Sequence, residues 1–143
     1  VIGAKAAGVK AINLKKDDVL AAAFIANTDS LYLLTQRGSL KRMAVADIPV
    51  TSRANRGLQV LRELKAKPHR VFAAGPVFGE TVDFDLFTTE AEASEEQILQ
   101  VLSNKGTAYE INLADLSLSE RTSNGSFISD TISDEEVFSA YIK

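Results

Sequence analysis

An internal repeat with a period of 68 residues is the feature that most constrains what this chain can fold into. Four pairs of residues recur at that spacing with no gap between them: Gly38 and Gly106, Asp47 and Asp115, Arg53 and Arg121, and Gly57 and Gly125. A shorter signature, in which a valine precedes an apolar residue and two small ones, occurs at 19–22, 71–74 and 137–140. Self-similarity at a fixed period is typical of propellers, solenoids and arrays, in which each unit buries its face on a neighbour.

The apolar residues between the repeated glycines alternate mostly with a period of two, which predicts β-strands. Gly38 and Gly106 each lie between two such segments, where a hairpin turn needs a residue that tolerates a positive φ. The stretch 90–102 has the Ala, Glu and Leu content of a helix, but the repeat places its second half on a strand. Its first half, 90–97, is predicted as a loop with at most one helical turn. The expected strands are 9–14, 19–25, 31–35, 40–45, 58–61, 71–77, 82–88, 98–103, 107–113 and 137–142.

The repeat and the strands together predict an all-β, propeller-like fragment of about two four-stranded blades with a half-blade at each end. The first blade is expected at about 19–61 and the second at about 71–128. Residues 1–14 would close a preceding blade, and residues 137–143 would open a following one. Because a closed propeller usually has about four to eight blades, the chain is expected to be a piece of a larger domain.

The net charge of −3 hides a division between the two halves of the chain. Residues 1–70 carry 13 Lys and Arg against 5 Asp and Glu, a net charge of +8, whereas residues 71–143 carry 3 against 14, a net charge of −11. An asymmetry of this size favours a polyanion as the partner of the basic half. The alternative is that one half only complements the other half or a neighbouring domain.

Two arginines stand on a predicted loop that ends at a repeated glycine, in the stretch Thr-Ser-Arg-Ala-Asn-Arg-Gly at 51–57. Arginine suits phosphate binding because its planar fork donates two parallel hydrogen bonds and keeps its charge. The second unit keeps Arg121 but has Asn124 in place of Arg56. Arg37, Lys41 and Arg42 form a second basic cluster at the first predicted hairpin. Two basic clusters in one unit favour phosphate binding over an ordinary solvated loop.

The stretches 7–14, 33–38 and 51–61 resemble the C-terminal domain of the A subunit of bacterial type II topoisomerases. That family forms a β-pinwheel of propeller-like blades, which binds and bends duplex DNA on its rim. The gyrase branch carries a box that reads Gln-basic-Arg-Gly-Gly-basic-Gly. Residues 51–57 keep only its arginine, its second basic residue and its closing glycine, so they are more similar to the topoisomerase IV branch. The gyrase branch remains the alternative.

The resemblance implies a non-catalytic domain that guides duplex DNA for ATP-dependent double-strand passage, and so for decatenation and supercoil relaxation. Its partners would be duplex DNA and, through the rest of its own polypeptide, the B subunit of topoisomerase IV, with a chromosome-organising protein as a further candidate. The fragment would need no cofactor, since ATP and Mg²⁺ act in other domains. It would work in the cytoplasm at the nucleoid, with peripheral membrane association left open.

The DNA-binding residues are expected to lie along one outer rim of the first blade and to grip phosphates without reading sequence. They are Arg37, Lys41, Arg42, Arg53 and Arg56, assisted by Lys5, Lys10, Arg62 and Arg70.

No catalytic or metal site is expected. Asp83 and Asp85 have the spacing of a magnesium-binding pair, but residues two apart on a strand share one face, which makes a solvated acidic edge the simpler interpretation. His69 lacks a carboxylate or nucleophile at a recognisable spacing. Tyr32 and Tyr109 lie in predicted strands without an adjacent base. The longest apolar run, 19–26, is too short to span a bilayer.

Two rival functions remain open from the sequence. A protein-interaction propeller would use its acidic face, around Glu92, Glu95 and Glu96, to hold a basic partner. A purely structural unit would only cap a larger domain whose other blades bind DNA.

Overall fold

The computed structural model describes residues 8–24, 27–78 and 97–143. The predicted strand at 82–88, residues 90–96 of the predicted loop 90–97, and Lys5 lie outside these residues. The described strands are β1 (Ser30–Thr35), β2 (Ser39–Ala44), β3 (Val71–Val77), β4 (Ile98–Ser103), β5 (Ala108–Asn112), β6 (Ser126–Phe127) and β7 (Val137–Ile142). Short 3-10 helices are η1 (Val45–Asp47), η3 (Leu113–Asp115) and η4 (Asp130–Asp134).

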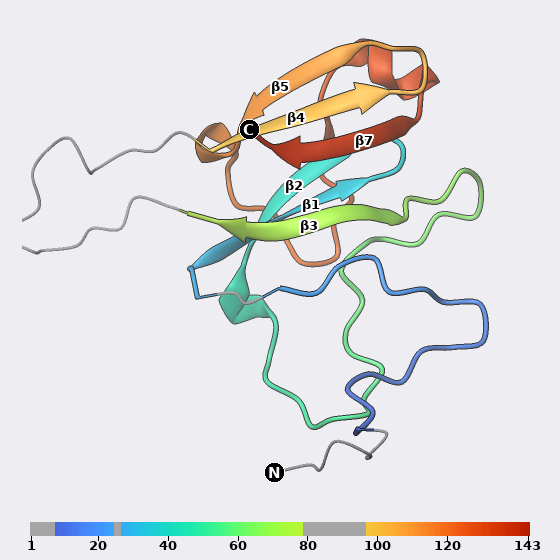
Figure 1. Cartoon of the computed structure of the whole chain (residues 1–143), viewed down its shortest axis with the longest axis vertical. Helices are drawn as coiled ribbons and strands as arrows, with labels where there is room; N and C mark the ends of the chain where they lie inside the picture. Colours follow the sequence, from blue (N-terminus) through green and yellow to red (C-terminus); the bar gives the residue numbers. More distant parts are fainter. Residues whose placement is uncertain (1–7, 25–26, 79–96) are drawn as a thin grey trace, which may run out of the picture.

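The strands form two antiparallel sheets that lie one above the other (Figure 1). The first sheet has the order β3-β1-β2-β6, and the second has the order β5-β4-β7. Both predicted hairpins are present, and their turn glycines have the expected positive φ, +81° at Gly38 and +86° at Gly106. The described residues contain no α-helix, so the all-β prediction is confirmed.

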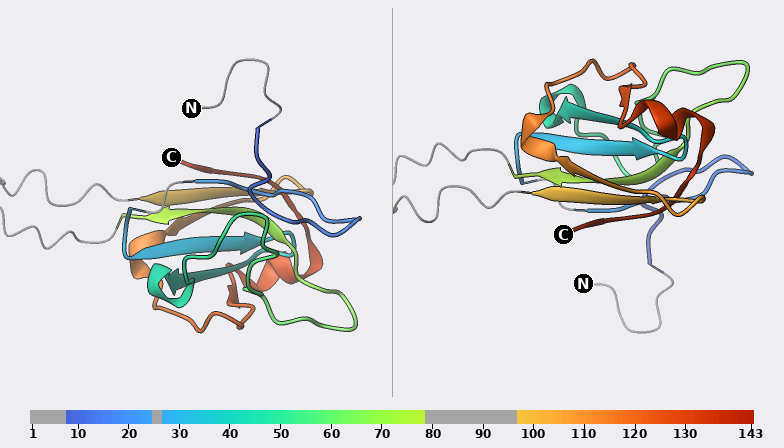
Figure 2. Two further views of the ribbon diagram at one scale, coloured as in Figure 1. Left: turned by 90° about the horizontal axis from the view of Figure 1, so that it is seen from below. Right: turned by 90° about the horizontal axis from the view of Figure 1, so that it is seen from above.

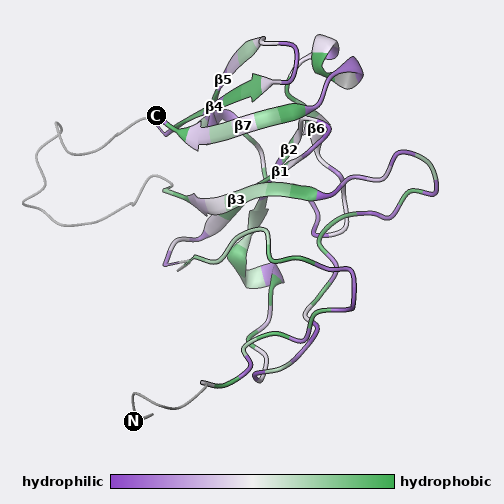
Figure 3. Cartoon of the chain, turned by 45° about the vertical axis from the view of Figure 1, so that its right-hand side comes forward, coloured by the Kyte–Doolittle hydropathy of each residue, from purple (hydrophilic) through white to green (hydrophobic). Residues whose placement is uncertain are grey.

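The hydrophobic core lies between the two sheets. Leu34 of the first sheet and Leu99 and Val101 of the second are fully buried there, and Ile132 of η4 closes one end. Figure 3 shows the apolar residues concentrated on the strands, while the connecting segments mix polar and apolar positions. The two sheets are therefore one packing unit.

The first sheet is covered on both faces. Every residue of β1 is buried, although only alternate residues can face the second sheet. On its other side, irregular chain from the segments 8–24 and 48–70 runs below the sheet (Figures 1 and 2), and its part 60–70 holds the sheet through Gln36, Arg37 and Lys41. We call these two segments the irregular layer. The molecule thus has three layers, with the four-stranded sheet in the middle.

Three predicted strands are wrong. Residues 9–14, 58–61 and the described part of 19–25 form no strand, and Ile12 makes only an isolated bridge to Asn55. Their alternating pattern is that of a strand, but a strand also needs a neighbour that pairs its backbone groups. The repeat shows the difference: β6 is equivalent to 58–59 and pairs with β2, whereas 58–59 has no such partner in the described chain.

The hydrogen-bonded sheets do not follow the two repeated intervals. The first sheet takes β1 and β2 from 19–61, but β3 and β6 from 71–128. The strand β7, expected in a following half-blade, pairs with β4. The sequence repeat therefore describes equivalent segments rather than complete sheets, and the blade boundaries stay a prediction.

Candidate nucleic-acid interface

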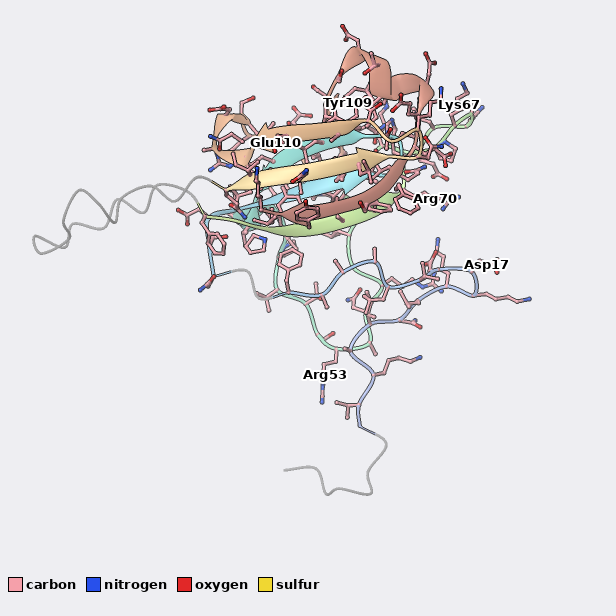
Figure 4. The ribbon with its side chains drawn as sticks, turned by 45° about the horizontal axis from the view of Figure 1, so that its top comes forward. Asp17, Arg53, Lys67, Arg70, Tyr109 and Glu110 are labelled. Carbon is pink, nitrogen blue, oxygen red and sulfur yellow. The ribbon has the colours of Figure 1, made fainter. Side chains whose placement is uncertain are left out.

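The cations predicted to bind phosphate do not form one continuous strip. Figure 4 shows Arg53 in the irregular layer, well apart from Arg70, which lies near Lys67 at the ends of the sheets. Five of the predicted residues are exposed: Lys10, Arg53, Arg56, Arg62 and Arg70. The other three that the structure describes are partly or fully buried: Arg37, Lys41 and Arg42. Their role in DNA binding stays a prediction.

Four basic side chains converge on a groove of about 900 Å³, which we call the basic groove. Its cations are Lys15, Arg62, Lys65 and Arg70, and Glu63 is its single acidic residue. The remaining lining residues are Gln59, Leu61, Leu64, Pro68 and His69. Among the residues that the structure describes, the ion pair within 4.0 Å joins Lys143 to Glu110, away from the groove. The four cations of the groove are therefore available to an anionic ligand.

Lys15 and Lys65 were not among the predicted site residues. Lys15 belongs to the turn 15–18, where its backbone N–H donates to the Asp18 carboxylate at 3.1 Å, and Lys65 belongs to the loop before β3. Fifty residues separate them in the sequence, so their proximity depends on how the irregular layer packs. The local signal that could have found them is the density of basic residues at 62–70.

Arg37 ties the end of the basic groove to the first hairpin. Its guanidinium donates to the Lys67 carbonyl at 2.8 Å and to Nε2 of His69 at 3.1 Å. It also lies over the ring of Phe127, 5.4 Å from the centroid, in a cation–π contact. Lys67 has a φ of +49°, a left-handed conformation that is rare outside glycine. Arg37 therefore fixes the loop that carries Lys65 and Arg70.

His69 is held neutral by the same contacts. Its Nε2 accepts from Arg37, so Nδ1 carries the proton and donates to Thr35 Oγ1 at 3.0 Å. Burial, and then the positive charge of Arg37, lower the pKa of His69 below its ordinary value. A neutral histidine lets Arg37 stay close to it without like-charge repulsion.

This arrangement predicts a pH dependence of stability. Because the pKa of His69 is lower in the folded state, the unfolded chain binds a proton first as the pH falls below about 6.5. The stabilising contribution of His69 is complete above that pH and is lost as the pH drops toward the lowered pKa. We expect His69→Gln, whose amide can still donate to Thr35, to lose less stability between about pH 7 and pH 5.5 in urea unfolding. Parallel pH profiles of the two proteins would contradict the assignment.

Lys41 does not lie on an exposed rim, and this prediction is wrong. Only 2% of its surface is exposed, because backbone at Val60 and at 120–123 encloses its side chain. Its ammonium donates to backbone carbonyls of Val60, Arg121 and Ser123. Burial, with a smaller contribution from the charge of Arg121, lowers the pKa of Lys41 to about 8. Its three N–H donors are thus used inside the protein.

Arg42 also serves the fold. Its Nε donates to Ser30 Oγ at 2.8 Å, and its guanidinium donates to the Leu116 carbonyl at 3.3 Å. It is half-buried. Of the cluster Arg37, Lys41 and Arg42 that the sequence predicted around the first hairpin, none is fully exposed.

The residue whose carbonyl accepts from the repeated hairpin turn has opposite charge in the two units. Gln36 N–H donates to the Arg70 carbonyl at 3.0 Å, and the equivalent Asn104 N–H donates to the Glu136 carbonyl at 2.8 Å. Arg70 thus occupies the position that Glu136 occupies in the second unit. A second cavity, of about 520 Å³, is lined by the basic residues Arg37, Lys67 and Arg70 and by the acidic residues Asp134, Glu135 and Glu136. The basic surface therefore ends at the acidic η4 region.

No cluster of three or more His, Asp or Glu side chains that could hold a metal ion occurs in the described parts of the chain. Asp83 and Asp85 lie outside those parts. No described helix has the length and apolar character needed to cross a membrane.

Comparison with known proteins identifies the family. The family described as "DNA gyrase C-terminal domain, beta-propeller" matches residues 1–27 and 29–77. The fold, with its two stacked antiparallel sheets and repeated hairpins, agrees with this match, and the chain belongs to that family.

Relatives from several bacteria carry the name of the A subunit of DNA topoisomerase 4. The chain is 67% identical over its whole length to the protein of Streptococcus pneumoniae and 44% identical over 91% of its length to that of Bacillus subtilis. It spans 17% and 14% of the length of these two relatives.

Solved structures agree in fold. A crystal structure of the C-terminal domain of DNA topoisomerase IV matches 99% of this chain, over 39% of its own, with a TM-score of 0.75 and 31% identity. A structure of the DNA gyrase A C-terminal domain matches 80% of this chain, over 33% of its own, with a TM-score of 0.57 and 16% identity, a likeness of fold alone.

Proposed function

We propose that this chain is a DNA-binding part of the A subunit of a topoisomerase IV, and that it holds duplex DNA by its phosphates. The observation that carries the proposal is the basic groove, in which four exposed cations and one acidic residue line about 900 Å³ on a chain of the DNA gyrase C-terminal domain family. The high identity to relatives named as the A subunit of DNA topoisomerase 4 supports this branch over the gyrase branch.

The chemistry of the groove suits phosphate rather than base recognition. Arg62 and Arg70 can each donate two parallel hydrogen bonds to a phosphate, and Lys15 and Lys65 add mobile point charges. These side chains come from a turn and a loop rather than from a helix or ribbon that would enter the major groove. The expected binding is therefore insensitive to sequence and strongly weakened by salt.

The charge distribution suggests a direction for the DNA. Lys10, Arg53 and Arg56 are exposed on the irregular layer and could extend the path beyond the basic groove. At the other end, Asp134, Glu135 and Glu136 would repel a phosphate backbone. DNA would thus cross the irregular layer and leave the protein before the η4 region.

In the whole enzyme, this part would guide a duplex toward ATP-dependent double-strand passage, together with the B subunit of topoisomerase IV, in the cytoplasm at the nucleoid. The relatives are far longer than the region matched here, and strand cleavage and ATP hydrolysis would occur in their remaining length and in their partner. Bending of the DNA follows if the phosphates contact Arg53 and Arg56 as well as the basic groove.

The test is a mobility-shift titration of the chain with two duplexes of unrelated sequence at several salt concentrations. Four phosphate contacts would give a log–log salt slope of about −3.6. Arg62→Glu with Arg70→Glu is expected to weaken binding at least about tenfold on both duplexes and to make the slope shallower by about two contacts. The same reversal at Arg53 and Arg56 tests whether the path continues over the irregular layer.

The matched control is Lys105→Glu with Lys143→Glu, which changes the net charge equally on the acidic unit. It is expected to leave the affinity almost unchanged. A strong preference for one duplex, or equal losses in the control, would contradict the proposal. If unmodified protein binds no DNA but binds a basic protein through an acidic face that Glu→Lys changes around Glu92, Glu95 and Glu96 disrupt, the interaction propeller is the correct function.

A further inference from the structure

The ammonium of Lys41 lies in a cage of backbone carbonyls. It donates to the carbonyls of Arg121 at 2.6 Å, of Ser123 at 2.8 Å and of Val60, and lies 3.4 Å from that of Glu120. Four oxygens around one buried ammonium can satisfy all three of its N–H donors. The acceptors come from two segments that lie far apart in the sequence, and neither is a strand of the sheet that carries Lys41.

One of these segments forms a wall of the basic groove. Gln59 and Leu61 line the groove on either side of Val60, and Arg62 follows directly. The Arg121 guanidinium donates to the Gln59 carbonyl, so two cations hold two consecutive carbonyls of this wall. The wall segment, 59–61, pairs with no strand in the described chain. Lys41 and Arg121 are therefore its principal contacts with the rest of the fold.

We propose that Lys41 is a positioning residue, which fixes the groove wall and thereby the place of Arg62 without touching DNA itself. The inference rests on the proposed function of the basic groove. Charge-assisted hydrogen bonds are stronger than neutral ones. A buried ammonium without these bonds would strongly destabilise the folded state. The cage and the ammonium therefore hold each other in place.

The second unit lacks this device. Tyr109 is the equivalent of Lys41, and its hydroxyl instead contacts Thr131 Oγ1 at 2.8 Å. In the described part of the chain, this cage of carbonyls around an ammonium, which we call the clamp, therefore occurs in the unit that carries the basic groove.

Lys41→Ala removes a propylammonium group and leaves the carbonyl cage. We expect duplex affinity to fall about tenfold, the order of one lost charge-assisted hydrogen bond to phosphate. Millimolar n-propylammonium chloride should restore most of the affinity, whereas NaCl at equal ionic strength should not. Lys41→Arg keeps the charge but places a larger planar group in the cage, so it should bind as poorly as Lys41→Ala. A direct phosphate contact predicts the opposite: Lys41→Arg would bind normally, and propylammonium would not help.

Arg121→Gln provides a second variant in case Lys41→Ala does not fold, because Arg121 is only half-buried. It should weaken binding about threefold to tenfold, while Lys105→Gln, which removes the same charge from an exposed turn, should not. Amide hydrogen exchange at 58–62 should be faster in Lys41→Ala, or in Arg121→Gln if the first is unfolded, and unchanged in Lys105→Gln.

The outcomes separate the two proposals. If unmodified protein fails to bind DNA, the proposed function is wrong, and exchange at 58–62 still decides whether Lys41 holds the wall. If unmodified protein binds DNA but the clamp variants bind equally well, with unchanged exchange, the positioning role is wrong and the proposed function stands.

Discussion

Gly125→Ala is expected to destabilise the chain by about 3 kcal/mol, enough to remove a large part of the stability of an ordinary domain. Gly125 has a φ of +71°, and a Cβ there would lie 2.5 Å from the Leu40 carbonyl oxygen. The left-handed conformation costs a residue other than glycine about 1–2 kcal/mol. The steric conflict adds to this, because Leu40 belongs to β2 and cannot move without disturbing the first sheet. Urea unfolding monitored by circular dichroism measures the change.

Gly57→Ala is the matched control, since Gly57 is the equivalent residue of the first unit. Its φ is +80°, but a Cβ there would meet nothing within 4 Å. Gly57→Ala should therefore cost only the free energy of placing alanine in a left-handed conformation, about 1–2 kcal/mol. Equal losses in the two variants would show that the contact with Leu40 does not matter. The difference between the two glycines measures how tightly β6 closes on β2.

Turn chemistry predicted a positive φ at Gly38 and Gly106, and the repeated glycines Gly57 and Gly125 share it, but the sequence did not predict what surrounds them. All four recurring positions, Gly38, Gly57, Gly106 and Gly125, have φ between +71° and +86°. Periodicity and turn chemistry are local, so they are visible in one sequence. The steric surroundings of Gly125 depend on the hairpin that its strand joins, which is distant in the sequence, and no local pattern encodes that pairing.

Strand pairing explains the three wrong strands in the same way. The segment 58–61 has the alternation of β6, yet only β6 lies beside a hairpin edge with free backbone groups. An alternating pattern shows that a segment can form a strand, whereas the partner decides whether it does. The hairpins were predictable because each strand's partner is its neighbour in the sequence.

The basic groove contains only two of the residues that the sequence predicted to bind DNA, for a related reason. Arg62 and Arg70 are exposed in the basic groove, as a basic loop before a strand suggests. Lys41 was misplaced because a lysine in an alternating strand normally faces solvent, and only coverage of both faces of β2 buries it. Lys15 joined the groove through packing of the irregular layer, which has no periodic signal.

Leu34→Ala is expected to lower the free energy of unfolding by about 3–4 kcal/mol and the melting temperature by about 10 °C. Leu34 is fully buried and belongs to a cluster with Val77 of its own sheet and Leu99 and Val101 of the other. Truncation removes apolar contacts between the two sheets and leaves a cavity. β1 is paired on both sides and fully buried, so it cannot shift to fill that cavity. Thermal unfolding followed by calorimetry measures the loss.

The shape of the transition carries as much information as its midpoint. If the two sheets share one core, Leu34→Ala should shift a single transition, because the second sheet loses its cover when the first unfolds. Leu118→Ala, the same truncation at a position that is 61% exposed, should change the free energy of unfolding by no more than about 0.5 kcal/mol. Two separate transitions, with only one of them shifted, would mean that the hairpin units fold independently. β3 and β6 belong to the second repeated interval but complete the first sheet. Because each interval depends on the other for its sheet, a single transition is expected.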